Sequence, residues 1–382
     1  MRLVLHGGFG EKGRTSLAIE SAGTRLLLDA GVKTSATGEP DYYPAITPEA
    51  LRATDAIVIT HGHEDHVAAL GWCIEHGFGG RIHMTAQTRR EADESLAGYA
   101  TPAQRDLVRA ASIGPLPVND GALRIGGLTV RTGRSGHIAG GVWCAVSDGR
   151  VQFAFCGDVV PASPVFAMDP LPACDAMALD ASYGDDDVSA AERAAQVALW
   201  VGAHPDGCIL PTPRFGRSAE LLAVVPGTIA LAPGMREALQ AQVDDTAWLA
   251  ADAARALPPR LATAIDWDGG PLPRAALLCH DAMGLAGPSR DILRRARAER
   301  IPTLFTGHLP AGSPGERMVA DGAAAWTRLP THPTLSENCA LAGHAGTRML
   351  LGHSCEPSAL ARLARHLPAL RSDLRTGDTV TL

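Results

Sequence analysis

The sequence predicts an α/β protein in which a core domain is interrupted by an inserted α/β domain. Short β-rich runs alternate with helical stretches along the 382 residues, and this alternation is typical of α/β folds. Near Val188 the chain changes to Ala-rich helical segments separated by short strands, and after Trp326 it returns to strand, helix, strand and helix. We therefore expect a core domain that is interrupted by an inserted α/β domain from about Val188 and completed by the C-terminal segment after Trp326.

Individual elements follow from the apolar runs and their period. The core should contain strands over 25–28, 56–60, 128–132, 142–147 and 151–156. The insert should contain helices over 190–201, 217–225, 235–256 and 291–300, with strands over 208–211, 275–279 and 303–306. The C-terminal segment should add a strand over 348–351 and a helix over 357–367.

Composition places the chain among ordinary globular proteins. It is 46% hydrophobic and 20% charged with a formal net charge of −7, which excludes a disordered or low-complexity chain. The acidic balance also excludes a polycation that coats nucleic acid through broad, salt-dependent attraction. No apolar run approaches the roughly 20 residues of a membrane span, and residues 1–14 lack the features of a signal peptide. We therefore expect no membrane association.

The eight cysteines indicate a reducing compartment. None of them forms a C-x-x-C pair, and several stand inside apolar runs, such as Cys144 in VWCAV and Cys156 in FAFCGD. Buried, reduced thiols are the expected state, which favours a cytoplasmic protein and argues against a structural zinc ribbon.

The strongest chemical signal is a histidine-rich run at the end of the predicted strand 56–60. It consists of Thr60-His61-Gly62-His63-Glu64-Asp65-His66. Imidazole and carboxylate are ligand types that zinc prefers. His61 and His63 leave the strand end two residues apart and can face one ion, whereas Asp65 and His66 turn into a helix and can face a second ion. A chance structural role does not explain four such side chains packed this densely.

Two later polar residues also stand at predicted strand ends. His137 lies in the loop after strand 128–132, and Asp158 follows strand 151–156 in the segment Phe155-Cys156-Gly157-Asp158. A Gly-Asp pair after a strand is often only a turn. In this order after the histidine-rich run, however, the two residues complete a two-metal set with Asp158 as the bridging carboxylate.

These residues resemble the pattern of the metallo-β-lactamase fold superfamily, in which an Asp after an early strand precedes H-x-H-x-D-H, a His and an Asp. Asp29 in Leu28-Asp29-Ala30 fits the first element. The resemblance implies a four-layer αββα sandwich with both metals at one edge of its sheets. It also implies that Asp29 does not bind metal itself but orients the metal-binding loop.

Beyond Asp158 the sequence resembles the β-CASP nucleases, the branch that includes ribonuclease J and the endonuclease subunit that cuts messenger-RNA 3′ ends. The segments that carry this resemblance are Asp180-Ala181-Ser182-Tyr183-Gly184, Phe215-Gly216-Arg217-Ser218-Ala219-Glu220-Leu221-Leu222, Gly287-Pro288-Ser289-Arg290, Phe305-Thr306-Gly307-His308, His332 and His353. The match covers nearly the whole chain. It implies a β-CASP cap over 185–310 within a metallo-β-lactamase core formed by 1–184 and 311–382.

The sequence departs from the family pattern at four places, and these departures bear on which substrate is bound. They are Ala181 where Ser is usual, Ala286 where Gly is usual, His308 where Tyr is common, and Ser354-Cys355-Glu356 where the family continues with Gly-Glu after its histidine. None of them removes an expected metal ligand.

The resemblance implies a role for each candidate residue. One divalent ion would be held by His61, His63 and His137, a second by Asp65, His66 and His353, and both by Asp158. Zinc is the expected metal, with manganese as the alternative. Two such ions activate water for attack on a phosphodiester in a core–cap cleft. Asp65, His332 and Asp180 are the expected catalytic residues, with His332 as general acid and Asp180 raising its proton affinity.

Residues that could touch the substrate are weaker candidates. Ser289 opens a predicted helix, where it could meet a phosphate or serve equally well as an ordinary helix start. Arg217 and Ser218 could contact phosphate, although Arg217 could instead cap its own helix. The histidines outside the metal set are expected to be structural, and His308 is the one for which a substrate contact remains open. For the arginine-rich helix over 290–300, a solvated surface is favoured over a nucleic-acid binding face.

The leading hypothesis is a metal-dependent phosphodiesterase that hydrolyses RNA or another single-stranded nucleic acid. A DNA exonuclease of the same family is the runner-up; His353 bears against it, because the DNA-repair branch usually has an apolar residue there. A small-molecule ester or phosphodiester hydrolase and a non-catalytic partner protein are the other classes considered. The predicted cap has twelve Arg against fifteen Asp and Glu, so we expect a focused site for a few nucleotides.

Overall fold

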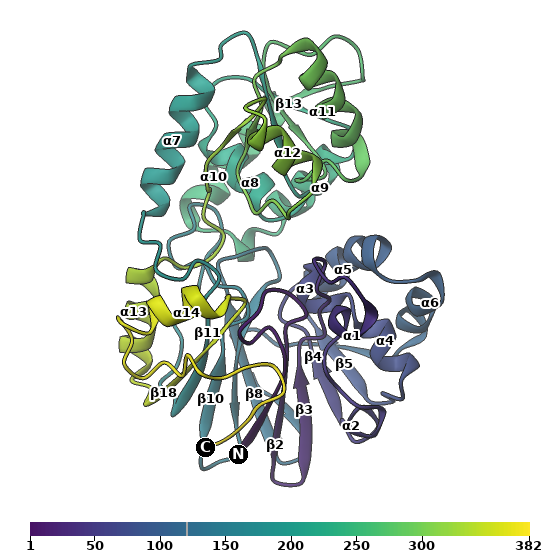
Figure 1. The fold of residues 1–382 in the computed structure, drawn as a ribbon, viewed down its shortest axis with the longest axis vertical. Coiled ribbons are helices and arrows are strands. Elements are labelled where there is room, and N and C mark those ends of the chain that lie inside the picture. The colour runs from purple at the N-terminus through teal and green to yellow at the C-terminus, as the bar shows by residue number, and fades with distance from the viewer. Residues whose placement is uncertain (120) are drawn as a thin grey trace. The chain divides into compact units, whose positions relative to one another are not determined.

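The computed structural model describes residues 1–119 and 121–382, which form two compact units (Figure 1). The first unit comprises 1–161, 168–187 and 332–382, and the second comprises 162–167 and 188–331. Compared with the predicted domains, the C-terminal part of the first unit begins at 332 and not at 311. The reason is a parallel pair of strands, β16 (Leu304–Phe305) and β17 (Ala325–Trp326), which holds 311–331 in the second unit.

Two β-sheets form the centre of the first unit. The seven-stranded sheet has the order β19-β1-β2-β3-β4-β5-β6. Its strands are β19 (Thr379–Thr381), β1 (Arg2–Gly7), β2 (Ser16–Ser21), β3 (Thr24–Leu28), β4 (Ala56–Val58), β5 (Arg81–Met84) and β6 (Ile113–Pro115). The six-stranded sheet has the order β18-β11-β10-β9-β8-β7. Its strands are β18 (Met349–His353), β11 (Ala176–Asp180), β10 (Gln152–Phe155), β9 (Val142–Ser147), β8 (Leu128–Arg134) and β7 (Leu123–Ile125).

Helices cover the outer face of each sheet. The helices that precede β7 are α1 (Glu39–Tyr42), α2 (Pro48–Arg52), α3 (Glu64–Val67), α4 (Leu70–Glu75), α5 (Ala86–Tyr99) and α6 (Pro102–Ala110). Within this group Leu70, Leu96 and Val108 pack with Leu27 and Ile57 of the seven-stranded sheet. On the other sheet, α13 (Leu335–Ala345) and α14 (Pro357–Leu363) enclose a separate apolar cluster.

Every second side chain along the strands points into the space between the two sheets. Leu26 and Leu28 flank Leu27 on β3 and therefore face the opposite side of the sheet. They are fully buried, as are Val146 and Phe153 of the other sheet. The first unit is thus a four-layer αββα sandwich, and the predicted fold class is confirmed.

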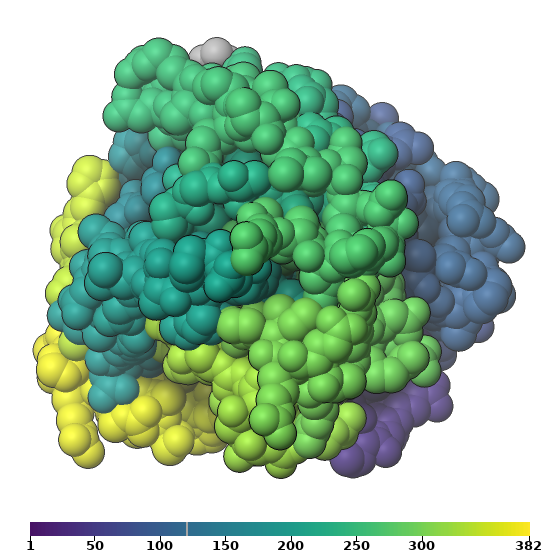
Figure 2. Space-filling model, turned by 90° about the horizontal axis from the view of Figure 1, so that it is seen from above, coloured from purple at the N-terminus to yellow at the C-terminus, as the bar shows by residue number. Residues whose placement is uncertain are grey.

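The second unit is a smaller α/β structure built on a parallel sheet with the order β12-β15-β13-β14. Its strands are β12 (Cys208–Pro211), β13 (Ile229–Leu231), β14 (Ile265–Asp266) and β15 (Ala276–Cys279). Its helices are α7 (Ala190–Gly202), α8 (Arg217–Val224), α9 (Met235–Asp244), the 3₁₀ helix η1 (Thr246–Trp248), α10 (Ala251–Thr263), α11 (Gly287–Glu299) and α12 (Pro314–Ala320). Figure 2 shows a face of this unit on which teal and green segments from distant parts of the sequence lie side by side.

One predicted element is wrong in kind. The expected helix over 235–256 is two α-helices, α9 and α10, because the chain between them forms the 3₁₀ helix η1 and then pairs with residues 162–167. Leu249 forms a β-bridge with Phe166, and the carbonyl of Trp248 accepts a hydrogen bond from the Ala167 amide. Tertiary pairing therefore overrides the local helical pattern here.

The cysteines lie as the sequence predicts. All eight are free, and all except the half-buried Cys339 are buried. Burial raises the pKa of the Cys73 thiol to about 12, so this thiol stays protonated at neutral pH. Among the described residues, no helix combines the length and apolar character that a membrane span requires.

A tight backbone crossing holds the histidine-rich run against the loop that follows β3. The amide of Ala30 donates to the carbonyl of His66, and the amide of Thr15 donates to the carbonyl of Asp65. Gly31 lies at the crossing, where an added Cβ would stand only 1.7 Å from the Asp65 carbonyl oxygen. The close approach of these two segments therefore requires glycine at position 31.

We expect Gly31→Ala to destabilise the first unit by about 3 kcal/mol, since a buried clash with rigid backbone must be relieved by separating the two segments. Gly98→Ala is the matched control, because Gly98 is an exposed residue of α5 with no atom near its Cβ position. It should stabilise by about 0.5–1 kcal/mol through helix propensity. Urea denaturation measures both effects, and equal midpoints for the two variants would refute the close approach at Gly31.

Candidate metal centre

The candidate ligands gather where strands of both sheets of the first unit end. Asp29 follows β3, His61 and His63 follow β4, and Asp158 follows β10. His353 is the last residue of β18, which runs parallel to its neighbour β11. Parallel strands bring their carboxyl ends to one edge of a sheet, so residues far apart in the sequence meet at this edge.

Four of the predicted ligands form one compact group. Nδ1 of His63 lies 3.2 Å from Nε2 of His61 and 3.0 Å from Nε2 of His137. Oδ2 of Asp158 lies 3.5 Å from Nε2 of His61 and 3.6 Å from Nε2 of His137. Ligands held about 2.0–2.1 Å from a tetrahedral zinc ion stand about 3.4 Å from each other. The four side chains therefore fit a single zinc-sized ion.

The other oxygen of Asp158 faces a second set of residues. Oδ1 of Asp158 lies 3.2 Å from Nε2 of His66, which lies 3.9 Å from Oδ2 of Asp65. The imidazole rings of His66 and His353 are 6.5 Å apart between centroids. Asp158 thus has one oxygen on each set, as the predicted bridging role requires.

Buried polar atoms without partners support a metal at this second set. Nε2 of His66, Nε2 of His353 and Oδ1 of Asp158 are all buried, and none makes a well-aligned hydrogen bond with a described residue, although the His66 and Asp158 atoms lie 3.2 Å apart. An unsatisfied buried polar atom is costly. Since all three are ligand atoms for divalent metals, the residues fit such an ion.

Asp29 and Thr60 orient two of the histidines. Oδ2 of the fully buried Asp29 accepts hydrogen bonds from Nδ1 of His66 at 2.7 Å and from Oγ1 of Thr60 at 2.8 Å. Oγ1 of Thr60 in turn accepts from Nδ1 of His61 at 3.1 Å. Both imidazoles therefore carry a proton on Nδ1, which leaves the Nε2 lone pairs directed at the candidate metal sites.

A second hydroxyl contact orients His353. Its Nδ1 lies 3.1 Å from Oγ of Ser354, so that the unpartnered Nε2 is again the ligand atom. Ser354 adopts a left-handed backbone conformation with φ of 58°, at the position where the resembling family has glycine. In this chain the strained residue supplies an oxygen that glycine lacks. Sequence reasoning missed Thr60 and Ser354, although both stand directly beside a predicted ligand.

The loop that carries His137 is fixed by contacts with α5 and β4. The carbonyl of Gly140 accepts hydrogen bonds from the hydroxyls of Thr85 and Thr88. The amide of Val142 donates to the carbonyl of Thr60 at 3.0 Å. The two sheets are thus connected at the residue that also orients His61.

The electrostatics of the cluster suit cation binding. Burial, followed by repulsion from His66, holds the pKa of His61 well below its usual value, and burial also lowers the pKa of His353. These imidazoles are therefore neutral, as metal ligation requires. Burial opposes charge on His66 as well, but Asp158, Asp65 and Asp29 outweigh it and raise its pKa well above the usual value. Without a metal, His66 therefore holds a second proton, on Nε2, where a bound cation would take its place.

His332 and Asp180 form a hydrogen-bonded pair beside the cluster. Nδ1 of His332 lies 2.9 Å from Oδ2 of Asp180, and the same nitrogen is 3.6 Å from Oδ2 of Asp158. Oδ1 of Asp180 accepts from the amide and the hydroxyl of Ser182. Burial alone would lower the pKa of His332, but the Asp180 and Asp158 carboxylates raise it above its usual value. The His332 side chain remains 21% exposed, so it can meet a substrate.

The predicted substrate contacts lie in the second unit, and Ser289, Ser218 and Arg217 have side-chain partners within it. Ser289 and Ser218 are fully buried. The Ser289 hydroxyl donates to Asp281, and the Ser218 hydroxyl donates to the carbonyl of Arg214. Arg217 donates to the hydroxyl of Thr331, and His308 is exposed. Contact of any of these residues with substrate stays a prediction.

The family is shown by comparison with known proteins. A family model described as the metallo-beta-lactamase superfamily matches residues 10–206, which span all the candidate ligands except His353. The chain belongs to the metallo-β-lactamase superfamily. A structure of a protein of unknown function from Enterococcus faecalis V583 has a TM-score of 0.67 at 12% identity and covers 100% of this chain and 99% of that one. This likeness shows the fold alone.

Curated proteins that are similar to this chain include a transcription termination factor and two ribonucleases. Transcription termination factor FttA of Methanothermobacter thermautotrophicus is 27% identical over 274 residues, which are 65% of this chain and 42% of that protein. Ribonuclease J of Corynebacterium glutamicum is 36% identical over 80 residues, 20% of this chain and 11% of that one. Endoribonuclease ysh1 of Schizosaccharomyces pombe is 27% identical over 163 residues, which are 40% of this chain and 21% of that protein.

The predicted resemblance to the β-CASP branch is confirmed, since FttA, ribonuclease J and Ysh1 all belong to that branch. The chain spans about two fifths of the length of the FttA proteins of Methanothermobacter thermautotrophicus and Cenarchaeum symbiosum. The fold and the His/Asp cluster together support divalent metal ions as cofactors.

We expect Thr60→Val to weaken zinc binding by about 10–100-fold, because it removes the hydroxyl that connects His61 to Asp29. Thr60→Ser keeps this hydroxyl and should bind zinc within about three-fold of the unchanged protein. Competition with a chromophoric chelator measures both affinities. Equal affinities for the Val and Ser variants would show that the hydroxyl does not orient the ligand.

Proposed function

We propose that this protein is a dinuclear metal-dependent phosphodiesterase that hydrolyses RNA. The observation that carries the proposal is the His332–Asp180 pair at 2.9 Å, placed beside the His/Asp cluster of the first unit. A metal cluster alone would suit many hydrolytic reactions on this fold. A positioned proton donor beside it is what a poor leaving group, such as a ribose oxygen, requires.

The side chains divide the work between holding metal and moving a proton. His61, His63 and His137 would hold one ion, Asp65, His66 and His353 the other, and Asp158 both. When bound, the pair of ions supplies a water nucleophile at neutral pH and offsets the charge of the phosphate. Asp180 fixes the proton of His332 on Nδ1, so Nε2 is the atom that can deliver a proton to the leaving oxygen. Asp65 lies on the open side of the cluster, where its side chain is 33% exposed.

The metal and the cellular location form part of the proposal. Zinc is favoured because four of the ligand atoms have the mutual spacing of a tetrahedral site, and manganese is the alternative. Eight free cysteines, of which seven are buried, support a cytoplasmic location. RNA is favoured as substrate because the names of the relatives ribonuclease J and endoribonuclease ysh1 identify them as ribonucleases.

We expect the zinc- or manganese-loaded protein to cleave end-labelled single-stranded RNA, and a chelator to abolish this activity. The same preparation is tested on single-stranded DNA of equal sequence and on a small phosphodiester. Faster cleavage of DNA than of RNA would favour the DNA exonuclease. Rapid hydrolysis of the small ester without cleavage of either polymer would overturn the nuclease proposal.

We expect His332→Ala to lower the rate of RNA cleavage by about 10²–10⁴-fold, the usual contribution of a positioned proton donor, with metal content unchanged. His137→Ala is the matched control and should lose metal as well as activity. Mass spectrometry of the purified proteins measures bound metal. Because Asp158, Asp180 and His332 could themselves hold an ion, loss of metal from the His332 variant would identify this residue as a ligand and not as the acid.

A further inference from the structure

The second unit has a groove lined by four arginines. Arg290, Arg294 and Arg297 come from α11, and Arg317 comes from α12. The groove has a volume of about 560 Å³, and none of the described residues that line it is acidic. None of the candidate metal ligands lies in this unit, so the groove and the candidate metal centre share no residue.

Helix geometry places the arginines of α11 in a row. Positions 290, 294 and 297 are separated by four and three residues, which puts them on one face of the helix. At 1.5 Å per residue, the row is about 10 Å long. All four arginines of the groove are exposed. The row is thus open along its length to an extended ligand.

The acidic residues next to the row form only weak, exposed ion pairs with its arginines. Arg294 pairs with Asp291 and Arg297 pairs with Asp321, each at 2.6 Å, but the side chains in both pairs are at least half exposed. Exposed ion pairs contribute only about 0–1 kcal/mol, so a bound anion can replace the carboxylates. Arg290 has no ion pair with another described residue.

The groove also has an apolar floor and rim. Leu293 and Met318 line it and are buried, whereas Leu285 at the rim is 52% exposed. A surface with guanidinium groups above apolar side chains suits a ligand that has both phosphates and flat bases. Guanidinium binds phosphate in a bidentate manner, and splayed bases stack on its plane or pack against apolar groups.

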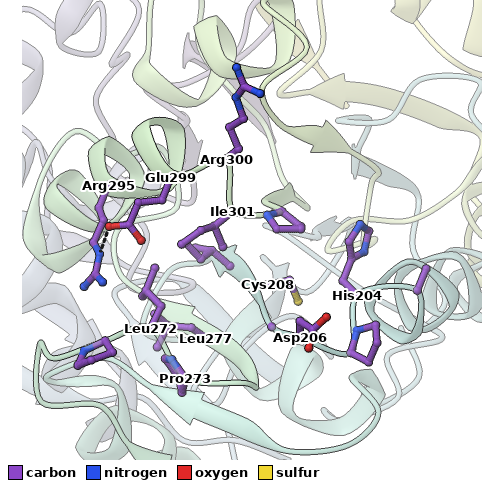
Figure 3. Close-up of a pocket in the computed structure, with 16 residues that line it drawn as sticks. His204, Asp206, Cys208, Leu272, Pro273, Leu277, Arg295, Glu299, Arg300 and Ile301 are labelled. Atoms are coloured by element: carbon purple, nitrogen blue, oxygen red, sulfur yellow. Dashed lines mark hydrogen bonds and ion pairs between the residues drawn. The ribbon is translucent and has the colours of Figure 1, made fainter.

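The groove lies in a segment that is more basic than the chain as a whole. Residues 284–321 contain six arginines against four acidic residues, whereas the whole chain has a net charge of −7. Another cavity of the same unit, shown in Figure 3, is lined by Asp206 and Glu299 as well as by arginines. There Arg295 donates to Glu299 and to the carbonyl of Gly270. That cavity offers no comparable site for a polyanion.

We propose that the groove formed by Arg290, Arg294, Arg297 and Arg317 binds the phosphate backbone of single-stranded RNA at nucleotides away from the cleaved bond. This assignment rests on the proposed function and extends it to the recognition of longer substrates. The groove raises affinity for polymeric RNA and takes no part in the chemical step. An acidic polypeptide is the competing occupant.

The experiment compares Arg290→Glu/Arg317→Glu with Arg300→Glu as the matched control. Arg300 is exposed, follows α11 directly and lines the other cavity (Figure 3). Fluorescence anisotropy follows the binding of a labelled single-stranded RNA of about 20 nucleotides at several salt concentrations. The double variant should bind at least about ten-fold more weakly, and the slope of log affinity against log salt should fall by about 1.4, since each phosphate contact contributes about 0.7. The control should stay within two-fold of the unchanged protein.

Hydrolysis of a small phosphodiester separates this proposal from the proposed function. All variants should hydrolyse it at the rate of the unchanged protein, because the groove contains no metal ligand. RNA binding by the double variant that equals the control would overturn the groove alone, whereas failure of the unchanged protein to bind or cleave RNA would overturn both proposals. Polyglutamate that competes as well as RNA would assign the groove to an acidic polypeptide. Arg290→Gln/Arg317→Gln should show the same loss of RNA binding in weaker form.

Discussion

The candidate metal centre depends on the buried carboxylate of Asp29. An isolated buried charge is costly, and hydrogen bonds must offset that cost. Asp29 has three donors, namely the Thr60 amide, the Thr60 hydroxyl and Nδ1 of His66. These bonds join the ends of β3 and β4 and set the tautomer of an imidazole at the same time. The same hydrogen bonds therefore offset the cost of burying the Asp29 carboxylate and orient the candidate ligands.

Neighbouring hydroxyl groups repeat this arrangement around the cluster. Thr60 contacts His61, Ser354 contacts His353, and Ser182 contacts Asp180. In each pair the hydroxyl stands one or two residues from the group that it orients, where the chain leaves a strand. A strand end can thus provide a functional side chain together with the group that orients it. This local arrangement keeps the candidate ligands aimed inward while the sheets supply the distances between them.

The sequence could predict that the candidate ligands lie close together, because their spacing has a direct physical cause. His61 and His63 leave one strand end together, so the motif alone brings them to one ion. The need for glycine at position 31 could not be predicted, because it arises from the crossing of two segments 34 residues apart, Gly31 and Asp65. The break between α9 and α10 likewise depends on the pairing of Leu249 with Phe166, and no glycine or proline marks it. Local patterns therefore predict the elements and which candidate ligands lie together, whereas long-range backbone contacts determine the rest.

The charges of the candidate metal centre and those of the arginine groove have opposite signs. The carboxylates Asp29, Asp65 and Asp158 make the metal centre acidic, and divalent ions would have to reverse that charge before a phosphate could approach. A centre built in this way cannot attract a long polyanion by its own side chains. Under the proposed function, affinity for polymeric RNA would have to come from guanidinium groups elsewhere, and the proposed groove on α11 and α12 is a place where an acidic chain supplies them. Weak attraction along most of the surface would also limit unproductive binding of long nucleic acids, because counterion release scales with the number of phosphates neutralised.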